Sequence, residues 1–326
     1  MTEILALAGS NLLSPIILSF VLGLAAAFAR SDLSVPEAVA KGLSIYLLFA
    51  IGFKGGVSVT ANGIDGTLIL SILSGLLLSF GLPLIAFALL KAMTALSRVD
   101  AAAVAAHYGS ISIVTFVAAT SILESRGIGA EGYMVAVAAA MEAPAILSAL
   151  WLVARGTPGS GRMESGLLRE ILLNGSIVLL VGSFLIGMLT GEDGLAEIAP
   201  FVVAPFKGVL CLFLLDMGLV AGRGLRGVRG TLGAGAAAFA VLMPLIGAAA
   251  GLALGAAIGL STGGIVLLMT LAASASYIAV PAAMRVALPE ANPSIYLTLS
   301  LGVTFPFNLT LGIPLYLAVA SALTGG

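Results

Sequence analysis

Long apolar runs occupy most of this chain, and they constrain its fold more than any single motif does. Each run is near the roughly 20 residues with which a helix crosses a hydrocarbon core of about 30 Å. With 60% hydrophobic and only 9% charged residues, the composition lies far outside that of soluble domains. The alternating short segments of a membrane β-barrel do not occur, so we predict an all-α integral membrane protein with ten transmembrane helices in the lipid bilayer. The predicted spans are 12–29, 38–53, 67–90, 101–123, 133–154, 171–190, 201–221, 231–259, 262–285 and 295–321.

A near-repeat divides the chain into two halves. Residues 45–56 (IYLLFAIGFKGG) reappear as residues 211–222 (CLFLLDMGLVAG), and residues 107–110 reappear as residues 273–276. Gly52 thereby pairs with Gly218, Gly56 with Gly222 and Ser110 with Ser276, all at one offset of 166 residues. A fixed offset over two separate segments indicates a duplicated unit.

The count of spans sets the orientation of the two copies. Because each copy holds five spans, the second must cross the membrane in the opposite sense, as in the inverted repeats of many secondary transporters. We therefore expect a first five-helix repeat at residues 1–154, a cytoplasmic connector at residues 155–170 and a second, inverted repeat at residues 171–326.

Basic residues give an independent test of this topology. With the N-terminus outside, the odd-numbered connections and the span ends beside them hold 11 of the 14 Lys and Arg residues. By the positive-inside rule, both termini are predicted to lie outside the cytoplasm, in an inner or plasma membrane. No basic tract or soluble domain is large enough to bind nucleic acid.

Four polar side chains stand inside predicted spans, where each is costly unless paired or hydrated. They are His107, Glu142, Asp216 and Asn308. For the two carboxylates a functional role is favoured over packing alone, whereas for His107 and Asn308 a packing hydrogen bond between helices remains equally open. No cofactor is expected.

The fourth and ninth spans are interrupted by small and hydroxyl-bearing residues, at 108–112 (YGSIS) and 274–277 (SASY). Such interruptions predict broken helices whose half-helix N-termini meet near the midplane, each carrying roughly half a positive charge. Two facing N-termini would bind an anion without an arginine. Gly109 and Ala275 would leave room for a small anion, and hydroxyl donors would come from Ser110, Ser112, Ser274 and Ser276. The alternative interpretation is that small residues only allow close helix packing.

A cation beside this anion would lower the cost of occupying a midplane cavity. Sodium is a hard cation that takes oxygen ligands, and carboxylates and exposed backbone carbonyls supply them. We expect Asp216, with help from Ser274 or Thr115, to support a Na⁺ site next to the anion site.

At these positions the chain resembles the cyanobacterial-type sodium-dependent bicarbonate transporters. The resemblance is carried by the stretches IGFKGG, AAHYGSISIVTF, EGYMVAVAAAMEAPAI, ASASYIAVPAAMR and LPEANPSIYLTLSLGVTFPFNLTLGIPLY. It implies a five-plus-five inverted-repeat carrier with a core and a gate subdomain, assembled as a homotrimer, that transports HCO₃⁻ with Na⁺ and is inhibited by a cytoplasmic PII-like protein. Carried over by position, it implies a bicarbonate site at Gly109, Ser110, Ile111, Ala275, Ser276 and Tyr277.

Other function classes can be weighed against this one. An enzyme is not expected, because no HExxH, GxSxG, DDxxD or paired-cysteine motif is present. A passive anion channel could also use facing helix N-termini, but it would not depend on sodium. A Na⁺-coupled symporter of another small anion, such as a carboxylate or sulfate, remains the strongest alternative.

Overall fold

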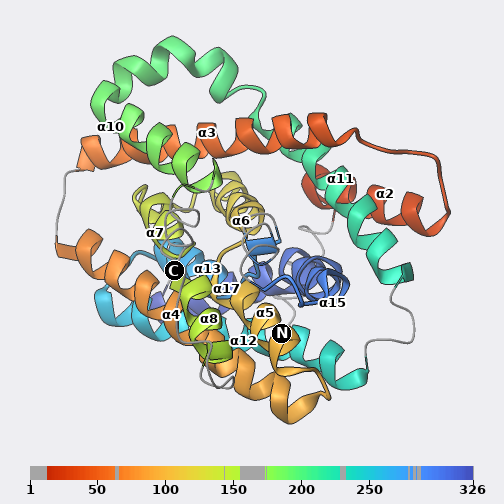
Figure 1. Cartoon of the computed structure of the whole chain (residues 1–326). Coiled ribbons are helices and arrows are strands. Elements are labelled where there is room, and N and C mark those ends of the chain that lie inside the picture. Colours follow the sequence, from red (N-terminus) through yellow and green to blue (C-terminus); the bar gives the residue numbers. More distant parts are fainter. Residues whose placement is uncertain are drawn as a thin grey trace.

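The computed structural model describes residues 13–62, 66–142, 144–154, 173, 175–227, 233–277, 280–281, 284 and 288–325. Every regular element in these ranges is helical (Figure 1). The α-helices are α2 (Pro15–Phe28), α3 (Glu37–Asn62), α4 (Gly66–Met93), α5 (Arg98–Gly109), α6 (Ile113–Ser125), α7 (Met134–Ala140), α8 (Pro144–Ala154), α10 (Gly175–Val202), α11 (Phe206–Gly227), α12 (Ala234–Ile258), α13 (Thr262–Ala273), α15 (Pro293–Leu297), α16 (Phe305–Phe307) and α17 (Ile313–Thr324). Two π-helical stretches, η1 (Thr298–Thr304) and η2 (Asn308–Gly312), lie within the last helical segment.

The chain is a multi-pass membrane protein. Among the described residues, eight helical segments are long and apolar enough to cross a bilayer, and two shorter apolar helices, α2 and α13, lie where the first and ninth spans are predicted. The long segments are 37–60, 66–93, 98–125, 134–153, 178–202, 206–226, 234–258 and 293–324. The prediction of an all-α membrane protein is therefore confirmed. The division into two repeats stays a prediction, since the connector at 155–170 lies outside the described residues.

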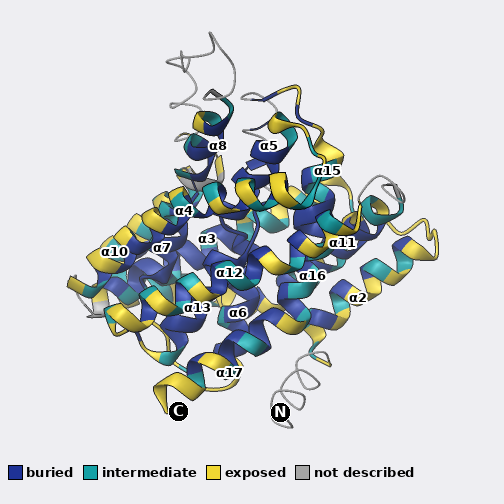
Figure 2. Ribbon diagram, turned by 90° about the horizontal axis from the view of Figure 1, so that it is seen from below, coloured by how far each residue is buried: buried dark blue, intermediate teal, exposed yellow. Residues whose placement is uncertain are grey.

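The helices form two groups. In one group, α3 packs along α10 and α11 packs along α2, and Figure 1 shows α3 and α10 running together along the upper side of the molecule. In the other group, α4, α5, α8, α12 and α13 pack on one another around the centre, and α6 and the segment from α15 to α17 pack on these helices. Large apolar residues such as Leu77 and Leu189 are exposed. Figure 2 shows exposed positions along the outer helices. These exposed faces are suited to lipid.

The repeated glycines make equivalent close contacts in the first group. A Cβ atom added at Gly52 of α3 would collide with the backbone carbonyl of Leu180 in α10, and one added at its repeat partner Gly218 of α11 would collide with the backbone carbonyl of Phe20 in α2. Glycine lets two helix backbones approach where any side chain would hold them apart. The near-repeat of the sequence therefore corresponds to two helix pairs that pack in the same way.

The central helices α5 and α13 also correspond, but with a different register. Each has 12 residues, and each begins after a serine whose side chain accepts a backbone hydrogen bond, Ser97 from Asp100 N (3.0 Å) and Ser261 from Gly264 N (3.1 Å). The residue that follows each helix is Ser110 or Ser274. The structure thus aligns Ser110 with Ser274, two residues away from the pairing with Ser276 that the sequence match suggests. Short stretches of small residues match at more than one register, and the helix ends decide between them.

Close packing at the repeated glycines predicts that Gly56→Ala destabilises the protein. The added methyl meets fixed backbone in α10, and overpacking of this kind costs about 1–3 kcal/mol. Gly81→Ala is the matched control, because nothing lies within 4 Å of a Cβ atom built at Gly81 in α4. Thermal unfolding in detergent should show a lower midpoint for Gly56→Ala and an unchanged or raised midpoint for Gly81→Ala. Equal midpoints for the two variants would contradict the packing account.

Candidate functional site

The fourth span is broken where the sequence predicts it. Helix α5 ends at Gly109, the next three residues are non-helical, with Ser110 extended at φ −88° and ψ 161°, and α6 begins at Ile113. The Ser112 Oγ atom accepts a hydrogen bond from the backbone N–H of Thr115 (3.2 Å). A serine in this position satisfies one of the N–H groups that a helix leaves unpaired at its start. The hydroxyl-bearing interruption therefore both ends one half-helix and starts the next.

The ninth span is broken in a similar way. Helix α13 ends at Ala273, and residues 274–276 are non-helical, with Ser274 extended at φ −81° and ψ 162°. The chain is helical again at Val280, whose N–H donates to Ser276 Oγ (3.4 Å). Both predicted interruptions are thus breaks in helices.

The two breaks bind each other directly. The Ser276 N–H donates to the His107 carbonyl (2.7 Å), and the Ser112 N–H donates to Ser274 Oγ (2.8 Å). We call residues 109–112 and 274–277 the crossing. It brings together all six predicted substrate-binding residues, and all six are buried: Gly109, Ser110, Ile111, Ala275, Ser276 and Tyr277.

Two hydroxyls of the crossing, those of Ser110 and Tyr277, have no hydrogen-bond partner among the described residues. The hydroxyl of Ser110 is buried, with the residue 1% exposed, and it makes no hydrogen bond with any described residue. A buried hydroxyl without a partner costs about 1–3 kcal/mol, so such groups are rare outside functional sites. An anion at the crossing would supply the missing acceptor.

The Cβ side of Gly109 is filled by protein. A Cβ atom added there would collide with the ring of Pro83 and the carbonyl of Ser79, both in α4. Gly109 therefore allows α4 to pack closely against the crossing. Ala275 is buried, with 2% of its surface exposed. A place for an anion beside Gly109 and Ala275 stays a prediction.

The predicted sodium ligands fall into two places. The Thr115 hydroxyl donates to Ser112 Oγ (2.8 Å), and Ser112 N–H binds Ser274 Oγ, so Thr115 and Ser274 belong to one hydrogen-bonded cluster. Asp216 is buried in α11, which packs mainly on α2, α3 and η1. No hydrogen bond or ion pair among the described residues joins Asp216 to the cluster. The structure thus groups two of the three predicted ligands.

Asn308 closes the end of α13. Its Nδ2 donates to the Ala273 carbonyl (2.9 Å), and its Oδ1 accepts from the Tyr316 hydroxyl (2.7 Å). Both ends of the amide are used by protein groups. Of the two roles that the sequence leaves open for Asn308, the structure therefore shows the packing hydrogen bond.

His107 stands on the last turn of α5. Its Nδ1 lies 2.7 Å from the Ala103 carbonyl, and its ring stacks on Tyr296 with 4.4 Å between ring centroids. A carbonyl only accepts, so Nδ1 carries the proton and Nε2 is the acceptor in the neutral ring. Nε2 is buried with no partner among the described residues, which leaves its role open.

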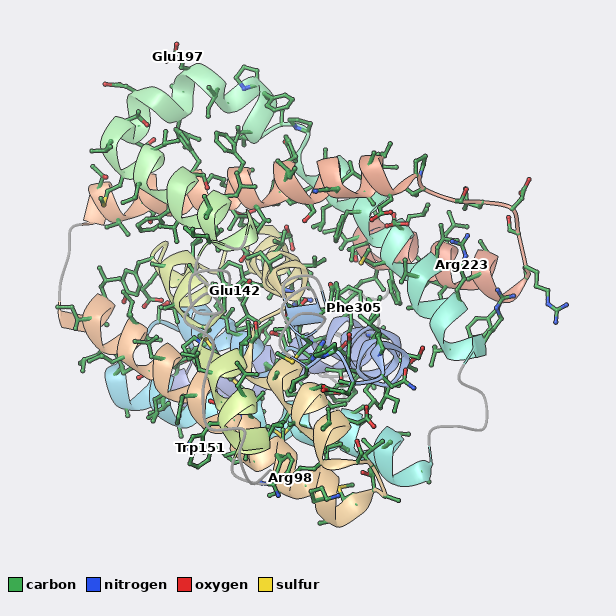
Figure 3. The ribbon with its side chains drawn as sticks, viewed as in Figure 1. Arg98, Glu142, Trp151, Glu197, Arg223 and Phe305 are labelled. Atoms are coloured by element: carbon green, nitrogen blue, oxygen red, sulfur yellow. The ribbon has the colours of Figure 1, made fainter. Side chains whose placement is uncertain are left out.

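Glu142 lies apart from the crossing. It occupies the turn between α7 and α8, is 4% exposed, and has an Oε2 atom with no partner among the described residues (Figure 3). The preceding carbonyl, that of Met141, accepts from the Ser79 hydroxyl in α4 (2.6 Å). Glu142 is therefore held near α4, and the structure does not assign it to the predicted sites.

A second hydrogen-bonded chain supports the crossing from the last helical segment, and the sequence analysis missed it. Thr304, in η1, donates to the Ala240 carbonyl (2.6 Å), so the Tyr108 hydroxyl donates to Thr304 Oγ1 (2.7 Å). In the same segment, the Phe305 ring packs edge-on against Tyr277 (5.1 Å between centroids; Figure 3). The unusual TFPFN stretch was the available signal, but a sequence pattern does not show which residues these side chains meet.

Comparison with known proteins gives a family match over nearly the whole chain. A family model described as the Na⁺-dependent bicarbonate transporter superfamily matches residues 15–321. The search of curated proteins found no match.

The hydrogen bonds of Asn308 predict that Asn308→Leu destabilises the crossing. The change leaves the Ala273 carbonyl and the Tyr316 hydroxyl buried without these partners, at a cost of about 1–3 kcal/mol for each group. Thr310→Val is the matched control, since the Thr310 hydroxyl binds the Pro306 carbonyl of its own helical segment. The thermal midpoint in detergent should fall clearly for Asn308→Leu and little for Thr310→Val. A midpoint for Asn308→Leu equal to that of the unmodified protein would remove this role.

Proposed function

We propose that this chain, which belongs to the Na⁺-dependent bicarbonate transporter superfamily, is a secondary active transporter that carries HCO₃⁻ together with Na⁺ by alternating access. The observation that carries the proposal is the crossing, where two broken helices bind each other and leave the Ser110 hydroxyl buried without a partner. Membership of a transporter family favours transport over catalysis.

The anion would bind at the helix start that follows the first break. The first N–H groups of α6 have no partner within the helix, and a helix N-terminus carries roughly half a positive charge. With the Ser110 hydroxyl beside them, these groups form a set of donors for a small oxyanion and need no arginine. We assign the bicarbonate site to Gly109, Ser110, Ile111, Ala275, Ser276 and Tyr277, and Gly109 also packs against α4.

The cation would bind beside the anion. Hydroxyl oxygens from Thr115, Ser112 and Ser274 already lie in one cluster, and hard cations take oxygen ligands of this kind. Asp216 would supply the negative charge from α11 when the two helix groups move relative to each other. A cation that neutralises the anion lowers the cost of occupying the membrane interior, which couples the two ions.

The same proposal includes the architecture and its setting. The matching pairs α3 with α10 and α11 with α2, and the matching half-helices α5 and α13, support a five-plus-five inverted repeat. The group of α2, α3, α10 and α11 would be the gate and the central group the core. We place the protein in the inner or plasma membrane with both termini outside the cytoplasm.

Assembly and regulation follow the family resemblance. We propose a homotrimer, and a cytoplasmic PII-like protein that acts on the inner face. The predicted cytoplasmic connector at residues 155–170 lies outside the described residues. A symporter of another small anion is the alternative that uses the same crossing, because the Ser110 hydroxyl and helix N–H groups would also bind a carboxylate or sulfate.

The sodium assignment predicts that Asp216→Asn lowers the apparent affinity of the transporter for sodium. Losing the carboxylate charge should raise the sodium concentration for half-maximal bicarbonate uptake about tenfold, because charge count tunes cation affinity in oxygen sites. Glu197→Gln, at an exposed acid in α10, is the control and should leave this concentration unchanged. If Asp216→Asn leaves the half-maximal sodium concentration unchanged, Asp216 is not a sodium ligand. The proposed site would then be limited to Thr115, Ser112 and Ser274.

The anion assignment predicts that Ser110→Ala weakens bicarbonate binding without destabilising the protein. The hydroxyl has no protein partner to lose, so the thermal midpoint should stay the same. The half-saturating bicarbonate concentration should rise about tenfold, the size of one hydrogen bond to a charged group. Ser112→Ala is the contrasting variant, because it removes the acceptor of two hydrogen bonds and should lower the midpoint. Wild-type affinity in Ser110→Ala would move the anion away from the crossing.

A further inference from the structure

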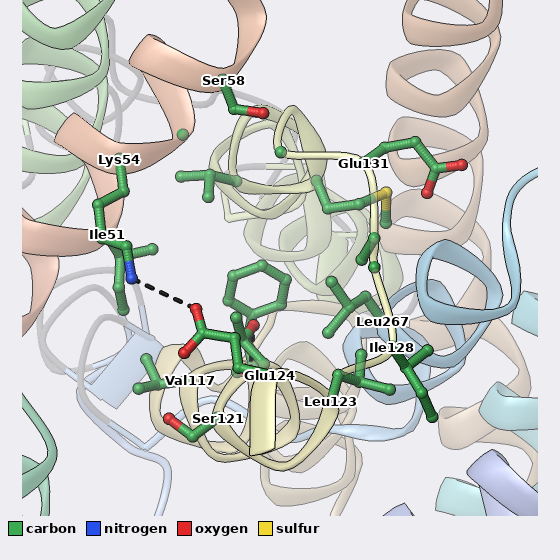
Figure 4. Close-up of a pocket in the computed structure, with 18 of the residues that line it drawn as sticks. Ile51, Lys54, Ser58, Val117, Ser121, Leu123, Glu124, Ile128, Glu131 and Leu267 are labelled. Carbon is green, nitrogen blue, oxygen red and sulfur yellow. Dashed lines mark hydrogen bonds and ion pairs between the residues drawn. The ribbon is translucent and has the colours of Figure 1, made fainter. Parts of the chain in front are cut away.

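A pocket of about 260 Å³ opens between the two helix groups, away from the crossing (Figure 4). Its walls come from α3, from α6, from the segment between α6 and α7, and from the start of α11. Most of the lining is apolar, with Phe116, Val117 and Leu267 among the side chains. The polar groups in it include Lys54, Ser58, Ser121 and Glu124. The pocket is therefore a largely apolar hollow with a small number of charged groups, as ligand sites commonly are.

An ion pair spans this pocket. Lys54 Nζ in α3 lies 3.3 Å from Glu124 Oε1 in α6, and no other salt bridge occurs within the described parts of the chain. The two side chains are 32% and 46% exposed, and the ammonium also lies 5.4 Å from the centre of the Phe206 ring. The pair joins helices that belong to different groups.

The second carboxylate that lines the pocket is already engaged. Glu131 accepts hydrogen bonds from Ser261 N (2.7 Å) and Ser261 Oγ (2.9 Å), at the start of α13. In Figure 4 its carboxylate points away from Lys54. The positive charge of Lys54 is therefore balanced by Glu124 alone among the acidic residues of this pocket.

An exposed ion pair of this kind contributes little to stability, because water screens it and two long side chains must be held in place. Glu124 is thus easily exchanged for another oxyanion at the same ammonium. The exchange keeps one oxygen acceptor at Lys54, so it avoids leaving the charge unpaired in a partly apolar pocket. The Lys54–Glu124 contact can therefore open at a small cost in free energy.

Helices α6 and α13, which adjoin the crossing, also line the pocket. Phe116 and Val117 in its wall stand one turn after Ile113, where α6 begins, and Leu267 belongs to α13. The pocket lies toward the end of α6 and the start of α13, which the predicted topology places outside the cytoplasm. An anion that enters from outside would meet Lys54 before it reaches the crossing.

We propose that this pocket is a second, outer binding site for a small oxyanion, in which the Lys54 ammonium exchanges the Glu124 carboxylate for the anion. The Ser121 hydroxyl also lines the pocket and is a further donor within it. The inference rests on the proposed function only in taking bicarbonate as the anion. Occupation of the site separates Lys54 from Glu124 and so releases one contact between the two helix groups.

Opposite effects of the two charged partners test the site by uptake. Lys54→Gln should raise the half-saturating bicarbonate concentration about fivefold, the size expected for one partly exposed charge contact. Glu124→Gln removes the carboxylate that competes with the anion for Lys54. It should lower the half-saturating bicarbonate concentration about threefold. Lys207→Gln is the control for the loss of a positive surface charge, because Lys207 is exposed and does not line the pocket. It should leave the half-saturating bicarbonate concentration unchanged. Equal impairment in Lys54→Gln and Glu124→Gln would mean that the pair only holds the helices together, and would overturn the proposal.

A binding measurement that does not need transport separates this site from the proposed function. In a Cys211→Ala background, Glu124→Cys places a thiol beside Lys54, and a negatively charged methanethiosulfonate reagent reports access to it. Bicarbonate that replaces gluconate at constant sodium and ionic strength should slow the labelling at least threefold, and Lys54→Gln should abolish that protection. Protection without uptake would leave the outer site and reject the symporter. Unchanged labelling, or equal protection in Lys54→Gln, would reject the outer site.

Discussion

The need to satisfy backbone groups inside a membrane governs this structure. A helix that stops within the bilayer leaves N–H and C=O groups that lipid cannot bind. Here each broken helix supplies partners to the other, through Ser112 with Ser274 and Ser276 with His107, and Asn308 takes up the last carbonyl of α13. The breaks are therefore possible only because the two half-helices are buried side by side at the centre. The other helices shield this crossing from lipid.

That requirement bears on the proposed anion site. The protein groups satisfy most polar atoms at the breaks, and the Ser110 and Tyr277 hydroxyls are left over. Helix starts next to them supply partial positive charge where no arginine or lysine occurs. The group of α2, α3, α10 and α11 packs internally through glycine contacts and meets the central group through rings such as Phe20 on Phe305 (5.3 Å). Under the proposed function, these two groups would move relative to each other in alternating access.

The sequence was sufficient for the features that depend on local chemistry. Apolar runs predicted the membrane helices, and the serine-rich interruptions predicted both breaks, because hydroxyl side chains and small residues act within a few positions of the backbone. Features that depend on distant partners could not be predicted. Gly109 faces Pro83 of another helix, and Lys54 meets Glu124, 70 residues away in sequence. The sequence match also paired Ser110 with Ser276, two residues from its structural counterpart Ser274. Only the ends of α5 and α13 distinguish the two registers.

Uptake of labelled bicarbonate into proteoliposomes, with and without an inward sodium gradient, tests the central claim most directly. The measurement should be made at a pH where leakage of CO₂ is small. Coupled transport predicts accumulation above equilibrium that requires the sodium gradient. Sodium-independent flux that only equilibrates would contradict the symporter and indicate a channel, and no flux at all would reject bicarbonate as the transported anion.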